Sequence, residues 1–144
     1  MAVIDAVPGV EVSIWIDGQP AKEYEDADEE VDGPLAPNAV VKYIEAISDT
    51  EFTIKPTVRP AFWAYRQTAY DLAFVVKVDG KRVAGTFWQA AHASHFVPWD
   101  FPLEGFYSTD AIGRPTLRPF KFAEVEIGWL TIHSWLWRVL IIPS

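Results

Sequence analysis

Residues 71–88 read DLAFVVKVDGKRVAGTFW, two apolar runs joined by Asp79-Gly80. The first run has an apolar residue at every second position, as a strand with one buried face requires: Leu72, Phe74, Val76 and Val78. An Asp-Gly pair between two such runs is the strongest short-range signal of a β-hairpin, because glycine adopts a positive φ without strain. The segment therefore predicts two antiparallel strands with a tight turn.

The same alternation occurs near the N-terminus, where residues 10–16 (VEVSIWI) end at Asp17-Gly18. Period two places one set of side chains on a buried face, namely Val10, Val12, Ile14 and Ile16. It places a second set on the opposite face, namely Glu11, Ser13, Trp15 and Asp17. The run predicts a strand that is half buried.

Three further runs predict strands, at residues 40–47 (VVKYIEAI), 51–55 (EFTIK) and 120–127 (FKFAEVEI). The short link between the first two favours an antiparallel hairpin, and Pro56 is expected to end the second. Before residue 128 no segment shows a sustained apolar stripe at helical spacing. Short strands without intervening helices predict an all-β chain, specifically an antiparallel β-sandwich over residues 1–127.

The net charge of −8 is concentrated in one place, because seven acidic residues lie between Lys22 and Asp32. Gly33-Pro34 follows, so the repulsion of like charges and these breakers predict a solvated loop over residues 22–38. The loop is a candidate docking site for a basic partner, through Glu25, Asp26, Asp28, Glu29 and Glu30. Its spacing does not match an EF-hand, and the negative charge argues against nucleic-acid binding.

Catalytic and metal-binding patterns are weak. The absence of cysteine excludes disulfides, thiolate metal sites and cysteine nucleophiles, and no nucleotide-binding or nucleophile-elbow glycine motif is present. His92 and His95, with Asp100 and Glu104 nearby, are the nearest approach to a metal site, and Ser94 with His95 and Asp100 is a faint triad. We expect neither an enzyme nor a bound cofactor or metal.

Residues 92–107 (HASHFVPWDFPLEGFY) have no clean period and contain two prolines, which predicts a long connection rich in aromatic residues. The rings either pack down on the sandwich or offer anchors to a partner, and the candidate anchors are Phe96, Trp99 and Phe101.

The leading functional hypothesis is a non-enzymatic protein-interaction or scaffold module. The alternative is a sandwich that binds a carbohydrate or another small molecule, or a hydrolase built on one, with Trp63, Trp88 and Trp99 as ring platforms. That alternative requires exposed, coplanar rings beside a carboxylate in a cleft.

The order of these strands resembles that of a family of fungal proteins that share an N-terminal domain of unknown function. The resemblance rests on residues 9–18 (GVEVSIWIDG) with Glu23-Tyr24, on VKYIEA and EFTI, on residues 72–80 (LAFVVKVDG) and on Phe120-Lys-Phe122, and it covers roughly residues 5–126. It implies a β-rich domain and carries over no catalytic residue, because the family has no established activity.

The apolar tail, residues 128–144, departs from the polar continuation that the resemblance implies. We consider a closing strand, a membrane tail that would make the protein tail-anchored, and a product of a retained intron or shifted reading frame. Arg138 and His133 within the tail argue against a membrane span. An intracellular location, cytoplasmic or nuclear, is expected, since no cysteine, glycosylation sequon or signal-like start is present.

Overall fold

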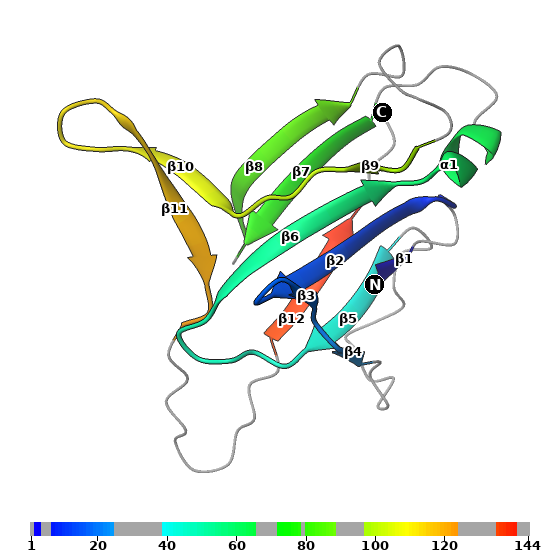
Figure 1. Ribbon diagram of the computed structural model, residues 1–144, viewed down its shortest axis with the longest axis horizontal. Coiled ribbons are helices and arrows are strands. Elements are labelled where there is room, and N and C mark those ends of the chain that lie inside the picture. Colours follow the sequence, from blue (N-terminus) through cyan, green and yellow to red (C-terminus); the bar gives the residue numbers. More distant parts are fainter. Residues whose placement is uncertain are drawn as a thin grey trace.

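The computed structural model describes residues 2–3, 7–24, 39–65, 72–78, 80–88, 97–123 and 135–140 (Figure 1). In chain order its elements are β1 (Ala2–Val3), β2 (Val10–Ile16), β3 (Gln19–Pro20), β4 (Glu23–Tyr24), β5 (Ala39–Ile44), β6 (Glu51–Val58), α1 (Pro60–Tyr65), β7 (Leu72–Val78), β8 (Lys81–Trp88), β9 (Trp99–Asp100), β10 (Gly105–Thr109), β11 (Pro115–Lys121) and β12 (Trp135–Leu140). Every strand pair among these elements is antiparallel. The chain is all-β, as predicted, with one short helix in the described part.

The main sheet is built around β2 and β6, which pair along the whole of β2. The register sets Val10 opposite Val58 and Ile14 opposite Ile54, so the apolar positions of both strands share one face. Val10, Val12 and Ile14 are buried, which confirms the period-two prediction. The opposite face carries Glu11, Ser13 and Trp15, of which Glu11 is buried and the other two are half buried.

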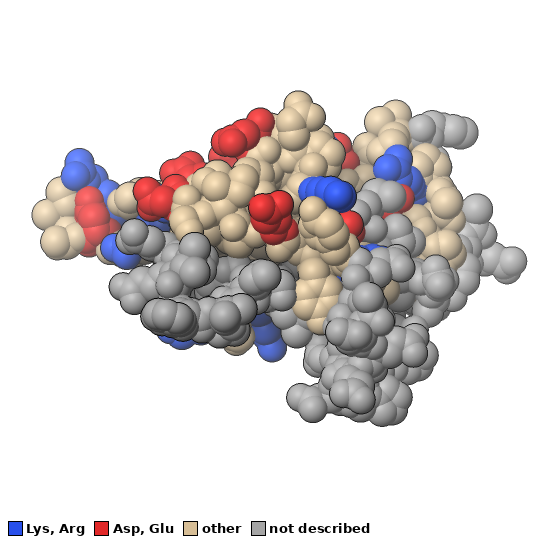
Figure 2. All heavy atoms as spheres, turned by 90° about the horizontal axis from the view of Figure 1, so that it is seen from below, with Lys and Arg blue, Asp and Glu red and all other residues tan. Residues whose placement is uncertain are grey.

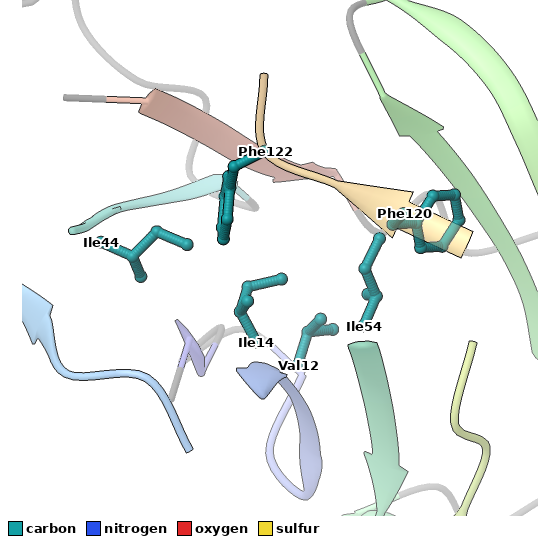
Figure 3. Packing of buried hydrophobic residues seen from close by; sticks show 6 residues of the cluster. All are labelled: Val12, Ile14, Ile44, Ile54, Phe120 and Phe122. Atoms are coloured by element: carbon teal, nitrogen blue, oxygen red, sulfur yellow. The ribbon is translucent and has the colours of Figure 1, made fainter. Parts of the chain in front are cut away.

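A second layer packs on the apolar face of this sheet. It consists of a three-stranded sheet in the order β12-β5-β4 and of the β7–β8 hairpin. In Figure 1, β12 passes behind β2, and β5 lies beside it, below β2. Ile44 of β5 joins the cluster formed by Val12, Ile14, Ile54, Phe120 and Phe122 (Figure 3). Phe74 of β7 joins a second cluster with Val7, Val10, Val58 and Phe62. The two layers form the antiparallel sandwich that the alternating strands predicted.

The β7–β8 hairpin forms as predicted. Val78 pairs with Lys81, and Gly80, which has a φ of 73°, lies in the turn between the two strands. Phe74 is buried, whereas Val75 on the other face is 49% exposed.

The prediction that residues 40–47 and 51–55 pair as a hairpin was wrong. β5 pairs with β4 and β12, and β6 pairs with β2, β9 and β11. Residues 45–50 instead carry the chain from one layer to the other, through a turn in which Asp49 has a φ of 64°. Ile44 therefore faces β2 and β6 across the core and is not beside them in one sheet.

Pro56 does not end its strand, contrary to expectation, because β6 continues to Val58. The carbonyl of Pro56 accepts a hydrogen bond from the Phe101 N–H at 3.0 Å, on the side of β6 away from β2. The N–H and C=O of one residue point to the same side of a strand, so the missing N–H of Pro56 falls on that side too. No bond between β2 and β6 is lost, which is why a proline is tolerated here.

Residues 99–121 contain more strand than the sequence indicated. The predicted connection includes β9 and the start of β10, and the strand expected at 120–127 begins instead at Pro115. Residues 124–127 lie outside the described part. β10 and β11 pair from Gly105 opposite Pro119 to Thr109 opposite Pro115 and project from the main sheet, at the left in Figure 1. We call this hairpin the arm.

Part of the apolar tail forms β12, whose six residues pair with β5 from Trp135 opposite Ile44 to Leu140 opposite Ala39. Among the described residues no helix is long and apolar enough to cross a membrane.

The start of the segment predicted as an acidic loop is a strand, since Glu23 and Tyr24 form β4. Residues 25–38 lie outside the described part.

Candidate functional site

An open groove of about 710 Å³ lies where the arm meets the polar face of the main sheet. Its walls are contributed by the β2–β3 turn, by β6, by the chain around β9 and by β11, and its lining residues are Trp15, Asp17, Gly18, Glu51, Phe52, Thr53, Lys55, Asp100, Pro102, Glu104, Leu117 and Pro119. An aromatic ring, prolines and a leucine thus share one concavity with four carboxylates. This mixture of apolar and charged groups is typical of binding surfaces.

Trp15 is the aromatic residue held on the polar face. Its Nε1 donates a hydrogen bond to the Ser13 Oγ at 2.9 Å, which satisfies the indole N–H. The Lys55 Nζ lies 4.7 Å from the centre of the Trp15 ring, a cation–π contact across β2 and β6. These contacts fix the half-buried ring in place, so the groove has a preformed apolar wall.

Lys55 also forms an ion pair with Asp100, with 2.9 Å between Nζ and Oδ2. The second oxygen of Asp100, Oδ1, accepts a hydrogen bond from the Thr57 Oγ1 at 2.8 Å. The hydrogen bond from Lys55, together with the one from Thr57, lowers the pKa of Asp100 below its usual value, although partial burial opposes the shift. Asp100 is therefore an ionised, internally compensated group.

The other three carboxylates of the groove are uncompensated. Asp17, Glu51 and Glu104 form no ion pair within the part of the chain that the structure describes. Each belongs to a different element: the β2–β3 turn, the start of β6 and the segment before β10. The groove thus carries a net negative charge.

The arm extends the apolar wall of the groove. Tyr107 lies directly opposite Leu117 on one face of the ribbon, and the two side chains are 77% and 41% exposed. On the other face Phe106 packs against the core, which anchors the base of the arm. The surface that continues from the groove along the arm is therefore apolar.

Asp110 stiffens the tip of the arm. Its Oδ1 accepts hydrogen bonds from the backbone N–H groups of Ile112 and Arg114, and its Oδ2 pairs with the Arg114 Nε at 3.0 Å. These backbone hydrogen bonds lower the pKa of Asp110. Figure 2 shows charged groups of both signs at the projecting end of the molecule, and acidic groups spread over much of the described surface.

Outside the groove, a buried carboxylate lies on the same sheet. The Glu11 Oε1 accepts from the Arg59 Nε at 2.6 Å, and this bond raises the pKa of Arg59. The Glu11 Oε2 is buried without a hydrogen-bond partner. Because Arg59 compensates its charge, we interpret Glu11 as a structural residue that ties β2 to the end of β6.

Residues 9–132 match the family described as Domain of unknown function (DUF7918). The chain belongs to this family. The match to DUF7918 continues into the apolar tail as far as residue 132, beyond the Phe120-Lys-Phe122 strand. Comparisons with curated proteins and with solved structures returned no match.

The structure describes only two of the residues that the sequence singled out for partner binding in this DUF7918 domain. Trp99 packs against the core cluster that contains Phe74, with 6.1 Å between the ring centres. Phe101 stacks on Trp99 at 5.6 Å and is half buried. The remaining candidates lie outside the described residues: Glu25, Asp26, Asp28, Glu29, Glu30 and Phe96.

The metal and triad hypotheses fall mostly outside the described residues as well, since these exclude Ser94, His92 and His95. Asp100 is described and is committed to Lys55 and Thr57. Within the ranges that the structure describes, no group of three His, Cys, Asp or Glu side chains could hold a metal ion.

Sequence reasoning missed the groove because its residues come from four separate segments. One signal was present: Trp15 falls on the polar face of an alternating strand, where a large ring is out of place unless it has a role. The proximity of Glu51, Glu104 and Leu117 to Trp15 depends on the folding back of the arm and has no local signature.

Asp100→Asn tests the Lys55 ion pair through its pH dependence. The pKa of Asp100 is lower in the folded chain than in the unfolded chain, where it is about 3.9. The ionised carboxylate therefore stabilises the folded chain above about pH 4, and this stabilisation is lost as the pH falls through the pKa of the folded state. Since Asp100 is 43% exposed, solvent screening limits the effect at neutral pH to well under about 1 kcal/mol. Thermal unfolding between about pH 6 and pH 3 should therefore show a flatter acid limb in Asp100→Asn than in the wild type.

Asp17→Asn is the matched control, because Asp17 lacks an ion pair among the described residues. It should keep the acid limb of the wild type. Identical acid limbs in Asp100→Asn and the wild type would show that the pair contributes nothing to stability.

Proposed function

We propose that this DUF7918 chain is a non-enzymatic interaction module that binds a positively charged segment of another protein in the groove beside the arm. The observation that carries the proposal is the combination of Trp15, Leu117 and Pro119 with three uncompensated carboxylates in one open concavity. Aromatic anchors surrounded by charges of one sign provide both affinity and selectivity at protein interfaces.

The acidity of the chain supports a basic partner. The net charge of −8 attracts cationic segments over distances comparable with the Debye length, about 8 Å at physiological ionic strength. The acidic residues from Glu25 to Glu30 carry charge of the same sign as the groove. We include them in the proposed binding surface on this ground of charge alone.

The carbohydrate alternative has weaker support. Trp99, one of its three candidate platforms, packs against the core and stacks on Phe101, so it does not offer a free ring face to a sugar. The side chains of Trp63 and Trp88 lie outside the described part of the chain.

From the order of the strand motifs we also propose a fungal origin, which the distribution of the family among genomes can test.

The charge reversal Glu104→Lys tests the proposed function. A fluorescent peptide of lysine and leucine residues is titrated with the full chain at low salt, and anisotropy gives the dissociation constant. The reversal should weaken binding about fivefold to tenfold, because an exposed charge contributes on the order of 1 kcal/mol. Raising the salt to about 0.5 M should reduce the difference, since surface electrostatics are screened.

Glu45→Lys is the matched control. Glu45 is exposed and is not a lining residue of the groove, so this variant changes the net charge equally without changing the site. Its dissociation constant should stay within about twofold of the wild type. Equal losses in Glu45→Lys and Glu104→Lys would mean that the peptide responds only to net charge, and the groove would not be the site.

A further inference from the structure

The outward edge of β11 cannot accept an added strand. The Phe120 N–H donates to the Glu104 carbonyl, and the Asp110 N–H donates to the Arg114 carbonyl, so the even-numbered residues of β11 point their backbone groups at β10. The odd-numbered residues therefore point outward: Pro115, Leu117 and Pro119. Two of these three are prolines without an N–H, which leaves the Leu117 N–H as the one donor along this edge.

A partner in the groove must therefore be recognised by its side chains and not by a β-ladder. Leu117 and Pro119 themselves line the groove, and the aromatic rings available there are Trp15 within it and Tyr107 opposite Leu117 on the arm. Aromatic-lined surfaces of this kind bind polyproline II segments, whose backbone needs no hydrogen-bond partner and loses little entropy on binding.

The carboxylates of the groove indicate that the bound segment carries basic residues. Glu51 and Glu104 line the groove together with Trp15 and Leu117, and neither is neutralised by a described cation. Arginine or lysine side chains on the segment would complement them, and would meet Asp17 at the β2–β3 turn. The groove is open, as a site for an extended chain that lies across a surface requires.

We infer that the occupant of the groove is a proline-rich, basic segment of a partner protein in the polyproline II conformation. The prolines pack on Trp15, Tyr107 and Leu117, and the basic residues pair with Glu51 and Glu104. This inference rests on the proposed function and specifies its partner class. The competing binding mode is the addition of a strand to the outer edge of β10. This strand contains no proline and no charged residue, and the N–H groups of Tyr107 and Thr109 point away from β11.

Three matched peptides test the inference against the full chain. The first alternates proline with arginine, the second replaces each proline by valine, and the third replaces each arginine by glutamine. Anisotropy titrations should give the first peptide an affinity roughly tenfold higher than either of the others. Valine keeps the charge but favours a β-strand, so the second peptide separates the two modes.

Tyr107→Ala locates the binding surface. Tyr107 is 77% exposed, so its removal should leave the melting temperature unchanged while it weakens the proline–arginine peptide about tenfold. Tyr24→Ala, at an exposed tyrosine of β4 that is not among the lining residues, is the control and should bind as the wild type does.

The results of these titrations distinguish a failure of the polyproline II inference from a failure of the proposed function. If the valine peptide binds as tightly as the proline peptide, or Tyr107→Ala leaves proline-peptide binding unchanged, the polyproline II inference is wrong. The proposed function survives that result if Glu104→Lys still weakens the basic peptides. If Glu104→Lys affects none of them, the proposed function fails, whatever the proline preference.

Discussion

Gly9→Ala is expected to lower the melting temperature of this protein by roughly 10 °C, from a loss of about 3 kcal/mol. Gly9 has a φ of 85°, which costs other residues about 1–2 kcal/mol. A Cβ on Gly9 would also collide with the backbone nitrogen of Phe62 in α1. Phe62 is only 1% exposed and belongs to a core cluster, so α1 cannot move away without opening the core.

Two other glycines separate these causes. Gly18 has a φ of 72° but open space where the methyl group of an alanine would lie, so Gly18→Ala should cost only about 1 kcal/mol through the backbone strain. Gly105 has no positive φ, yet its Cβ would collide with the carbonyl of Arg118 on β11. Thermal unfolding of all three variants should show a larger loss for Gly9→Ala and for Gly105→Ala than for Gly18→Ala. Equal losses at Gly9 and Gly18 would contradict the close packing of α1 on Gly9.

Removal of residues 135–144 is expected to have the second large effect, loss of the stable fold. β12 pairs with all six residues of β5. An antiparallel ladder has about one hydrogen bond for each residue pair, and at about 0.5–1.5 kcal/mol per bond the sum is comparable with the total stability of a domain, about 5–15 kcal/mol. The truncation would also leave β5 as an edge that pairs with β4 only at Tyr43 and Ile44. Size-exclusion chromatography and thermal unfolding should show aggregation or a much lower melting temperature.

A shorter truncation, which removes residues 141–144, is the control, because it keeps every pair of β12 with β5. It should elute at the same volume as the full chain and should have a melting temperature close to that of the full chain. If the longer truncation melts at the same temperature as the full chain, residues 135–140 are not part of the fold. The tail would then be better explained as a membrane segment or as a product of incorrect splicing.

Local patterns in the sequence were enough to assign strands and the faces that they bury. Val10, Val12 and Ile14 are buried because side chains alternate across any strand, whatever it pairs with. The turn at Gly80 follows from the same kind of local rule, since a two-residue hairpin loop needs a positive φ. These features involve residues that are close in the chain.

Which strands pair with each other, and why a proline is tolerated inside β6, depended on the tertiary structure. Residues 45–50 are short enough for a hairpin, but Ile44 is buried by crossing to the other layer, so β5 pairs with β12, far along the chain. Pro56 fits inside β6 because its nitrogen faces away from β2, which the sequence does not reveal. The alternation of residues in a strand specifies which of its faces is apolar, but it does not specify with which other strands it pairs.

Residue patterns alone were sufficient to identify an antiparallel β protein with half-buried strands, because burial with period two is a property of each strand alone. The place where a partner could bind became visible only in the folded chain. The arm carries Glu104 and Leu117 to Trp15 and Glu51, and no local rule predicts which long-range contacts a protruding hairpin makes. The groove exists because the chain leaves the edge of β6 after Leu103, forms the arm and returns at Phe120.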